Sequence, residues 1–244
     1  FNDLSHIIGD ISWTYYFIFF LCLILSSIIV AFKWGWILRY QDIFLSFKSI
    51  ITIHWIGSFY NQILPGRISG DAIKVLYVIS KFPNKKAGIT FSVIIDRLFN
   101  IIGIVIIAVI SLFFYQSQDN YLPFIFFISF VIITLLWLVF FGDKLLKIKF
   151  INNLEILKKL IGAFGTSKMY LNSAAKIAFV LFWALIYGLS TILMNYLLGF
   201  AIGIEVPFSY YLFFIPIVTI ITIIPISIGG LGIREGGYMY FLNL

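Results

Sequence analysis

Apolar residues occur in long runs, and most of the lysines and arginines lie in the polar segments between these runs. Run 11–32 is apolar for 22 positions, and run 87–114 is interrupted mainly by the adjacent residues Asp96 and Arg97. A helix needs about 20 such residues to cross a hydrocarbon core of about 30 Å. Together with runs 122–141 and 177–204, this pattern predicts an all-α polytopic membrane protein.

Two further apolar runs are shorter. Run 49–64 would rise only about 24 Å as a helix, which is less than a full crossing. Lysine and arginine flank it on both sides, which predicts a re-entrant hairpin that enters and returns on the cytoplasmic side. Run 208–224 is interrupted by Pro216 and has Arg234 as its only nearby cation, so both a second re-entrant hairpin and an inward crossing remain open.

The two short runs end in matching sequences, FYNQILPGRISGDAIK at 59–74 and TIITIIPISIGGLGIRE at 219–235. In each, a proline is followed by a glycine five positions later and by a cation nine positions later. Broken segments at corresponding places in two halves indicate a substrate site built by an internal repeat, which is inverted if the hairpins enter from opposite sides. The residues expected to form the broken backbone are Pro65, Gly66, Gly70, Pro225, Gly229, Gly230 and Gly232.

Composition supports the membrane assignment, since 62% of the 244 residues are hydrophobic and 11% are charged. We expect one transmembrane domain, 1–244, which continues at one or both ends because it starts at Phe1 without methionine and stops inside an apolar run. The net charge of +7 fits positive-inside sorting at an inner membrane and does not indicate nucleic acid. Residues 1–10, with two aspartates, are expected outside, and loop 142–176, with seven lysines, is expected in the cytoplasm.

Enzyme and metal signatures are missing from the sequence. It contains no HExxH, GxSxG, phosphate-binding GxxxxGK[ST] or clustered aspartate motif. Two histidines and the single Cys22 cannot make a typical metal site. We therefore expect no cofactor, no metal and no catalytic residue.

Asp96 and Arg97 would lie roughly 15 Å deep in the membrane, about ten residues into the long run. Each charge there costs at least ~2.5 kcal/mol on insertion scales, so ionic partners are expected. Neighbours on a helix point about 100° apart, and each must therefore face a different element. Asn100 shares the Asp96 face.

The expected partners are the charged ends of the two broken segments. The set has one surplus positive charge, which suits a pocket that holds a single phosphate. The alternative is purely structural, in which pairs such as Asp96–Arg234 or Asp71–Arg97 lock helices together. The candidate substrate-binding residues are Arg67, Asp71, Lys74, Asp96, Arg97, Asn100, Arg234 and Glu235.

Several nearby residues also have two interpretations. Gly229, Gly230 and Gly232 would either allow a positive φ beside a headgroup or allow tight helix packing. His54 is expected to be a hydrogen-bonded structural residue rather than a proton carrier. Asn61, at the tip of the first hairpin, is a candidate substrate contact.

Three motifs together resemble the transmembrane region of the lysylphosphatidylglycerol synthase family, a flippase-like family of inner-membrane proteins. They are NQILPGRISGDAIKVLYV, VIIDRLFNIIGI and IPISIGGLGIREGG. Ser69 and Lys74 depart from the family pattern, where glycine and arginine are common. The matching residues are Leu64, Pro65, Gly66, Gly70, Asp71, Lys74, Asp96, Arg97, Pro225, Ser227, Gly229, Gly230, Gly232, Arg234 and Glu235.

The resemblance implies a unit that translocates aminoacylated phosphatidylglycerol, another anionic phospholipid or a polyprenyl-phosphate-linked lipid. No segment resembles the soluble aminoacyl-transfer domain of bifunctional relatives, so we do not expect synthase activity. The alternatives are a membrane-embedded partner of a separate lipid-linked glycosyltransferase or aminoacyl-lipid synthase, and a scaffold that binds lipid without moving it.

Overall fold

The computed structural model describes residues 13–63, 69–114, 173–222 and 231–242. All regular structure in these ranges is helical, which confirms the predicted all-α class. The elements are α2 (Trp13–Arg39), α3 (Phe47–Ile63), α4 (Ser69–Lys81), the 3₁₀ turn η1 (Pro83–Lys85), α5 (Lys86–Phe114), α8 (Ala174–Ala201), α9 (Phe208–Ile221) and α10 (Ile233–Leu242).

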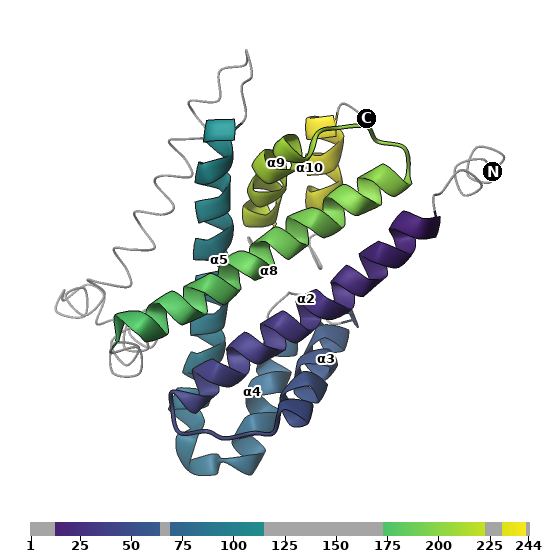
Figure 1. Ribbon diagram of the computed structural model, residues 1–244. Helices are drawn as coiled ribbons and strands as arrows, with labels where there is room; N and C mark the ends of the chain where they lie inside the picture. Colours follow the sequence, from purple (N-terminus) through teal and green to yellow (C-terminus); the bar gives the residue numbers. More distant parts are fainter. Residues whose placement is uncertain (1–12, 64–68, 115–172, 223–230, 243–244) are drawn as a thin grey trace, which may run out of the picture.

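Three stretches of the described chain are long and apolar enough to cross a membrane, and they contain α2, α5 and α8. Helices α2 and α8 pack along one another in opposite directions, and α5 packs against both (Figure 1). The predicted spans 11–32, 87–114 and 177–204 therefore correspond to helices, whereas the span 122–141 and residues 142–172 of the predicted loop 142–176 lie outside the described residues.

The end of α2 differs from the prediction. The apolar run 11–32 predicts a helix that stops near residue 32, but α2 continues to Arg39. A Schellman motif then ends it, in which the Ile43 N–H donates to the Leu38 carbonyl oxygen and Asp42 has a φ of 56°. Leu38 and Ile43 are both fully buried, so packing fixes this helix end.

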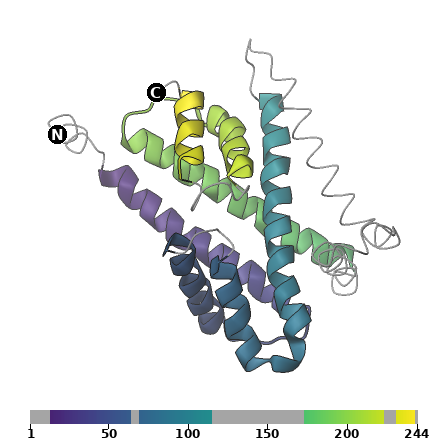
Figure 2. The same ribbon diagram turned by 180° about the vertical axis from the view of Figure 1, so that it is seen from behind.

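Two pairs of shorter helices lie at opposite ends of α5 (Figures 1 and 2). Helices α3 and α4, with 17 and 13 residues, pack together where α5 begins. Helices α9 and α10, with 14 and 10 residues, pack together near the other end. All four are shorter than the roughly 20 residues of a spanning helix. Their re-entry into a membrane and their origin in a repeat remain predictions.

Separate apolar clusters hold the two pairs. Around α3 and α4, buried residues such as Ile53 and Val78 pack with residues of α2 and α5. Around α9 and α10, Phe214 and Phe241 pack with residues of α5 and α8. The first cluster fixes α4 against α2 and α5, and this packing positions the charged side chains described next.

Candidate functional site

A buried ion pair joins α2 to α5. Lys33 Nζ lies 3.1 Å from Asp96 Oδ1, and it also donates to Asn100 Oδ1 and to the Asp96 carbonyl oxygen. The Lys33 side chain has 0% exposure. Its ammonium thus donates hydrogen bonds to two acceptors on α5 and forms an ion pair with a carboxylate of the same helix. The expectation that Asp96 and Asn100 share a face is confirmed, because one lysine contacts both.

Lys33 was not among the sequence-predicted site residues. In the sequence it directly follows the apolar run 11–32. In the structure it is fully buried, and α2 continues for six residues beyond it, up to Arg39. The sequence did contain one signal that could have identified Lys33. Asp96 is an intramembrane carboxylate, and such a group needs a cation on another helix.

Asp71, at the start of α4, contacts two cations. Its Oδ1 lies 3.2 Å from Lys74 Nζ, and its Oδ2 accepts a hydrogen bond from Arg97 Nε on α5. Asp96 and Arg97 thus face different helices, as the 100° step between helical neighbours predicts. The pair Asp71–Arg97, which we considered as a structural lock, is present.

Trp34 completes a ring of contacts through α2, α4 and α5. Lys74 Nζ lies 5.9 Å from the centre of the Trp34 ring, within cation–π range. The indole Nε1 of Trp34 donates to Ser92 Oγ at 3.1 Å. Side chains of α2, α4 and α5 therefore contact one another around Trp34 and Asp71.

Close contact between α3 and α4 holds Asp71 and Lys74 in place. A Cβ on Gly70 would meet the Gly57 carbonyl oxygen at 1.9 Å, and a Cβ on Gly57 would meet Lys74 Cε at 2.6 Å. Only glycine allows this approach. Asn61 Oδ1 accepts a hydrogen bond from the Gly70 N–H at 2.8 Å, so the described contact of Asn61 is structural.

His54 lies on α3, one turn before Gly57, and is 9% exposed. Its backbone carbonyl accepts a hydrogen bond from Ser58 Oγ at 2.9 Å. Its ring Nδ1 has no hydrogen-bond partner among the described residues. Our expectation of a hydrogen-bonded structural histidine is therefore not met at this nitrogen.

We call Lys33, Asp71, Lys74, Asp96 and Arg97 the ion cluster. It contains three cations and two carboxylates, so it carries one surplus positive charge, the balance that the sequence predicted for a larger set. Exposure differs strongly within it: the Arg97 side chain is 38% exposed, whereas those of Asp71 and Lys74 are each 10% exposed.

Arg234 and Glu235 lie elsewhere. They begin α10, which packs on α9, and they form an ion pair with each other at 3.6 Å. Among the described residues no ion pair or hydrogen bond joins either one to the ion cluster, so the alternative Asp96–Arg234 pair is absent and Asp96 pairs with Lys33 instead.

Glu235 has a structural task. Its Oε2 accepts a hydrogen bond from the Gly232 N–H at 2.6 Å, which is half of a capping box at the start of α10. Hydrogen bonds from the backbone N–H groups of Glu235 and Gly232 hold the pKa of this carboxyl below its usual value. Gly232 has a φ of +83° and open space around its Cβ position, so its glycine is required by conformation and not by packing.

The remaining predicted residues cannot be placed in this arrangement. Pro65, Gly66, Arg67, Pro225, Gly229 and Gly230 lie outside the described residues. The described part of the chain contains no group of histidine, cysteine, aspartate and glutamate side chains that could hold a metal ion.

Long apolar helices around a buried ion cluster define an integral membrane protein built from α-helices. The sequence model of the lysylphosphatidylglycerol synthase TM region matches residues 1–244, and the chain belongs to this family.

One relative has a curated description. The UPF0104 membrane protein PH1989 of Pyrococcus horikoshii is 30% identical over 89 residues, which make up 36% of this chain and 27% of that protein. The chain thus matches about a quarter of the relative's length. No solved structure matches the chain significantly.

Proposed function

We propose that this protein binds the phosphate of an anionic phospholipid or polyprenyl-phosphate-linked lipid at the ion cluster and moves the headgroup across the membrane. The observation that carries the proposal is the surplus cation of the cluster, combined with the position of Arg97 as its most exposed member. Ionisable groups inside membrane segments are functional by default, because their insertion is unfavourable.

The cluster divides into a supporting part and a binding part. Lys33 is fully buried and its ammonium is held by α5, so the Lys33–Asp96 pair supports the helices. Arg97 and Lys74 both contact the Asp71 carboxylate and present positive charge beside it. A phosphate, like the Asp71 carboxylate, offers negatively charged oxygen acceptors, and arginine binds phosphate through charge-assisted hydrogen bonds.

A headgroup amine would be recognised by the same group. With a phosphate on Arg97 and Lys74, the Asp71 carboxylate is the nearest acceptor for a positively charged substituent such as an aminoacyl group. The acyl chains would stay in the bilayer while the headgroup enters between α2, α4 and α5. Rocking of one helix pair against the other would expose the headgroup to each side in turn.

The proposed site is not catalytic. We place the protein in the inner membrane, with the basic ends of α2, α4 and α5 toward the cytoplasm, as the positive-inside rule indicates. Its partners are the lipids themselves, and a separate synthase or glycosyltransferase would supply or consume them.

The test uses purified protein in vesicles that contain a fluorescent phosphatidylglycerol. A membrane-impermeant reductant bleaches outer-leaflet lipid, and a translocating protein makes the protected half accessible. We expect Arg97→Gln and Lys74→Gln to slow the loss of fluorescence from the protected half strongly. Lys74→Arg should keep the wild-type rate, as should the control Lys86→Gln at the exposed start of α5.

Two results would contradict the proposal. One is equal rates of loss in vesicles with and without the wild-type protein. The other is conversion of the labelled lipid to a new product, which would favour the enzyme or enzyme-partner alternative.

A further inference from the structure

A recess lies between α2 and α3, and none of its lining residues belongs to the ion cluster. Its volume is about 190 Å³, and it is lined by Phe32, Gly35, Trp36, Arg39, Phe47 and Ile50. Four of these residues come from α2, at positions 32, 35, 36 and 39, a spacing that places them on one helix face. Lys33 and Trp34, which belong to the ring of contacts described above, point away from this face.

The walls of the recess are apolar and largely aromatic. The ring centres of Phe32 and Phe47 are 6.3 Å apart across the two helices, and those of Phe32 and Trp36 are 6.2 Å apart. Gly35 forms part of the floor, where a Cβ would meet Ile50 Cδ1 at 2.7 Å. A surface of this kind favours a hydrocarbon chain over a polar ligand.

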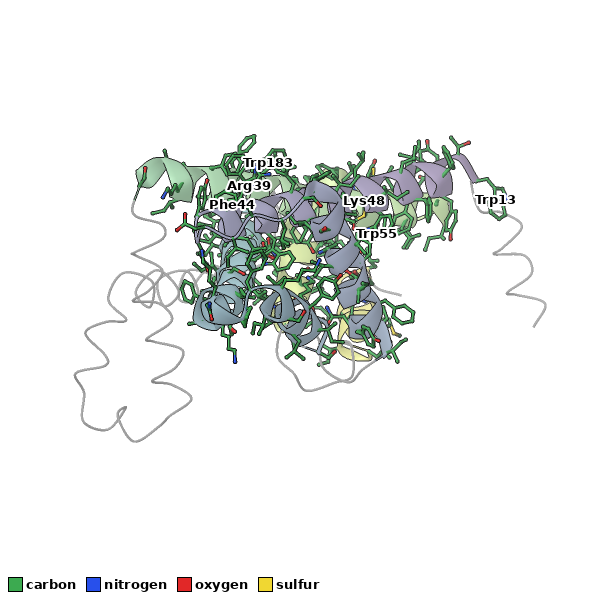
Figure 3. All side chains as sticks on the ribbon, turned by 90° about the horizontal axis from the view of Figure 1, so that it is seen from below. Trp13, Arg39, Phe44, Lys48, Trp55 and Trp183 are labelled. Carbon is green, nitrogen blue, oxygen red and sulfur yellow. The ribbon has the colours of Figure 1, made fainter. Side chains whose placement is uncertain are left out.

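The rim carries a positive charge. Arg39 is the last residue of α2, is exposed, and its guanidinium carbon lies 4.9 Å from the centre of the Trp36 ring. Lys48 is exposed in the first turn of α3. Figure 3 labels Arg39 and Lys48, together with the aromatic residues Phe44 and Trp55, along the side formed by α2 and α3.

The spacing between wall and rim fits one phospholipid. Phe32 and Arg39 are separated by seven residues, which is about 10 Å along a helix. With the aromatic rings at the edge of the hydrocarbon, the guanidinium reaches the level of lipid phosphates. Arginine binds phosphate through parallel hydrogen bonds, and a basic surface favours anionic lipid.

We propose that this recess is a binding site for an anionic phospholipid of the leaflet at the basic end of α2, with the phosphate on Arg39 and one acyl chain packed against Phe32 and Phe47. The bound lipid links the first long helix to the α3–α4 pair. This site is separate from the ion cluster and does not depend on the proposed translocation.

The test is native mass spectrometry of the detergent-purified protein, titrated with dioleoyl phosphatidylglycerol or with dioleoyl phosphatidylcholine. All variants carry Arg97→Gln, so that lipid bound at the ion cluster does not dominate the signal. We expect Arg39→Gln to weaken phosphatidylglycerol binding about fivefold, as the loss of one basic residue at an anionic surface predicts. Arg39→Lys should restore most of it.

Phe47→Ala tests the acyl-chain half of the site. Phe47 is exposed, so its removal should leave the fold intact while it weakens the binding of both lipids. Lys86→Gln removes a cation elsewhere on the same end of the molecule and should change neither. The proposal is overturned if Arg39→Gln and Lys86→Gln bind phosphatidylglycerol equally well, or if Phe47→Ala binds both lipids as its parent does.

Discussion

Lys33 on α2 and Asp96 on α5 form an ion pair of 3.1 Å in which the lysine side chain has no exposed surface. The two residues are 63 positions apart in the chain, and the pair fixes the first long helix to the helix that carries Arg97. The binding part of the ion cluster therefore depends on a supporting pair that contacts no ligand in our account.

Lys33→Met should destabilise the protein by about 3–5 kcal/mol, because it leaves the Asp96 carboxylate buried without its cation. Thermal unfolding in detergent measures the effect. The double variant Lys33→Met/Asp96→Asn should lose less than the sum of the single variants, since the two groups interact directly. The exposed Lys48→Met serves as control. Additive effects of the two single changes would show that the pair does not stabilise the helices.

Gly70→Ala should separate α3 from α4, because the new Cβ would lie 1.9 Å from the Gly57 carbonyl oxygen. Overpacking of this kind costs about 1–3 kcal/mol. The matched control is Gly236→Ala in α10, where nothing lies within 4 Å of the new Cβ. That change should be neutral or stabilising, since alanine is the better helix former. Equal unfolding temperatures for the two variants would contradict the close packing of α3 on α4.

Variants at Glu235 distinguish a role in helix capping from a role in ligand binding. Glu235→Gln should preserve the start of α10, because a glutamine side chain can also accept the Gly232 N–H bond. Glu235→Ala should lose that bond and increase amide hydrogen exchange in the first turn. Vesicle assays of both variants complete the test: loss of translocation in Glu235→Gln with normal exchange would assign the carboxylate to the substrate instead.

The arrangement around Asp96 and Arg97 could be predicted because few parameters control it. Charged groups inside the membrane need ionic partners. Neighbouring side chains on a helix point about 100° apart, so these two residues face different helices. The partner of Asp96 could not be predicted, because hydropathy does not mark where a helix ends. The hydropathy around Lys33 fits both a helix that stops beside this residue and a helix that continues to Arg39. The Schellman motif and the burial of Leu38 and Ile43 determine where α2 ends.

The repeat led to a larger site than the described residues support. Lys74 and Arg234 occupy matching offsets, yet Lys74 joins Asp71 on α4 whereas Arg234 pairs with Glu235 on α10. Matching offsets in the sequence therefore do not give matching ionic partners in the described residues.

The most direct test of the central claim is equilibrium binding of a short-chain phosphatidylglycerol to the purified protein, measured calorimetrically in an Arg39→Gln background. Our account predicts that Arg97→Gln weakens binding about tenfold or more, since an arginine–phosphate contact is a strong charge-assisted one. The affinity of Arg97→Lys should lie between those of the parent and Arg97→Gln. Arg234→Gln should bind as the parent does. Binding by Arg97→Gln at the parent's affinity would contradict a phosphate site at the ion cluster.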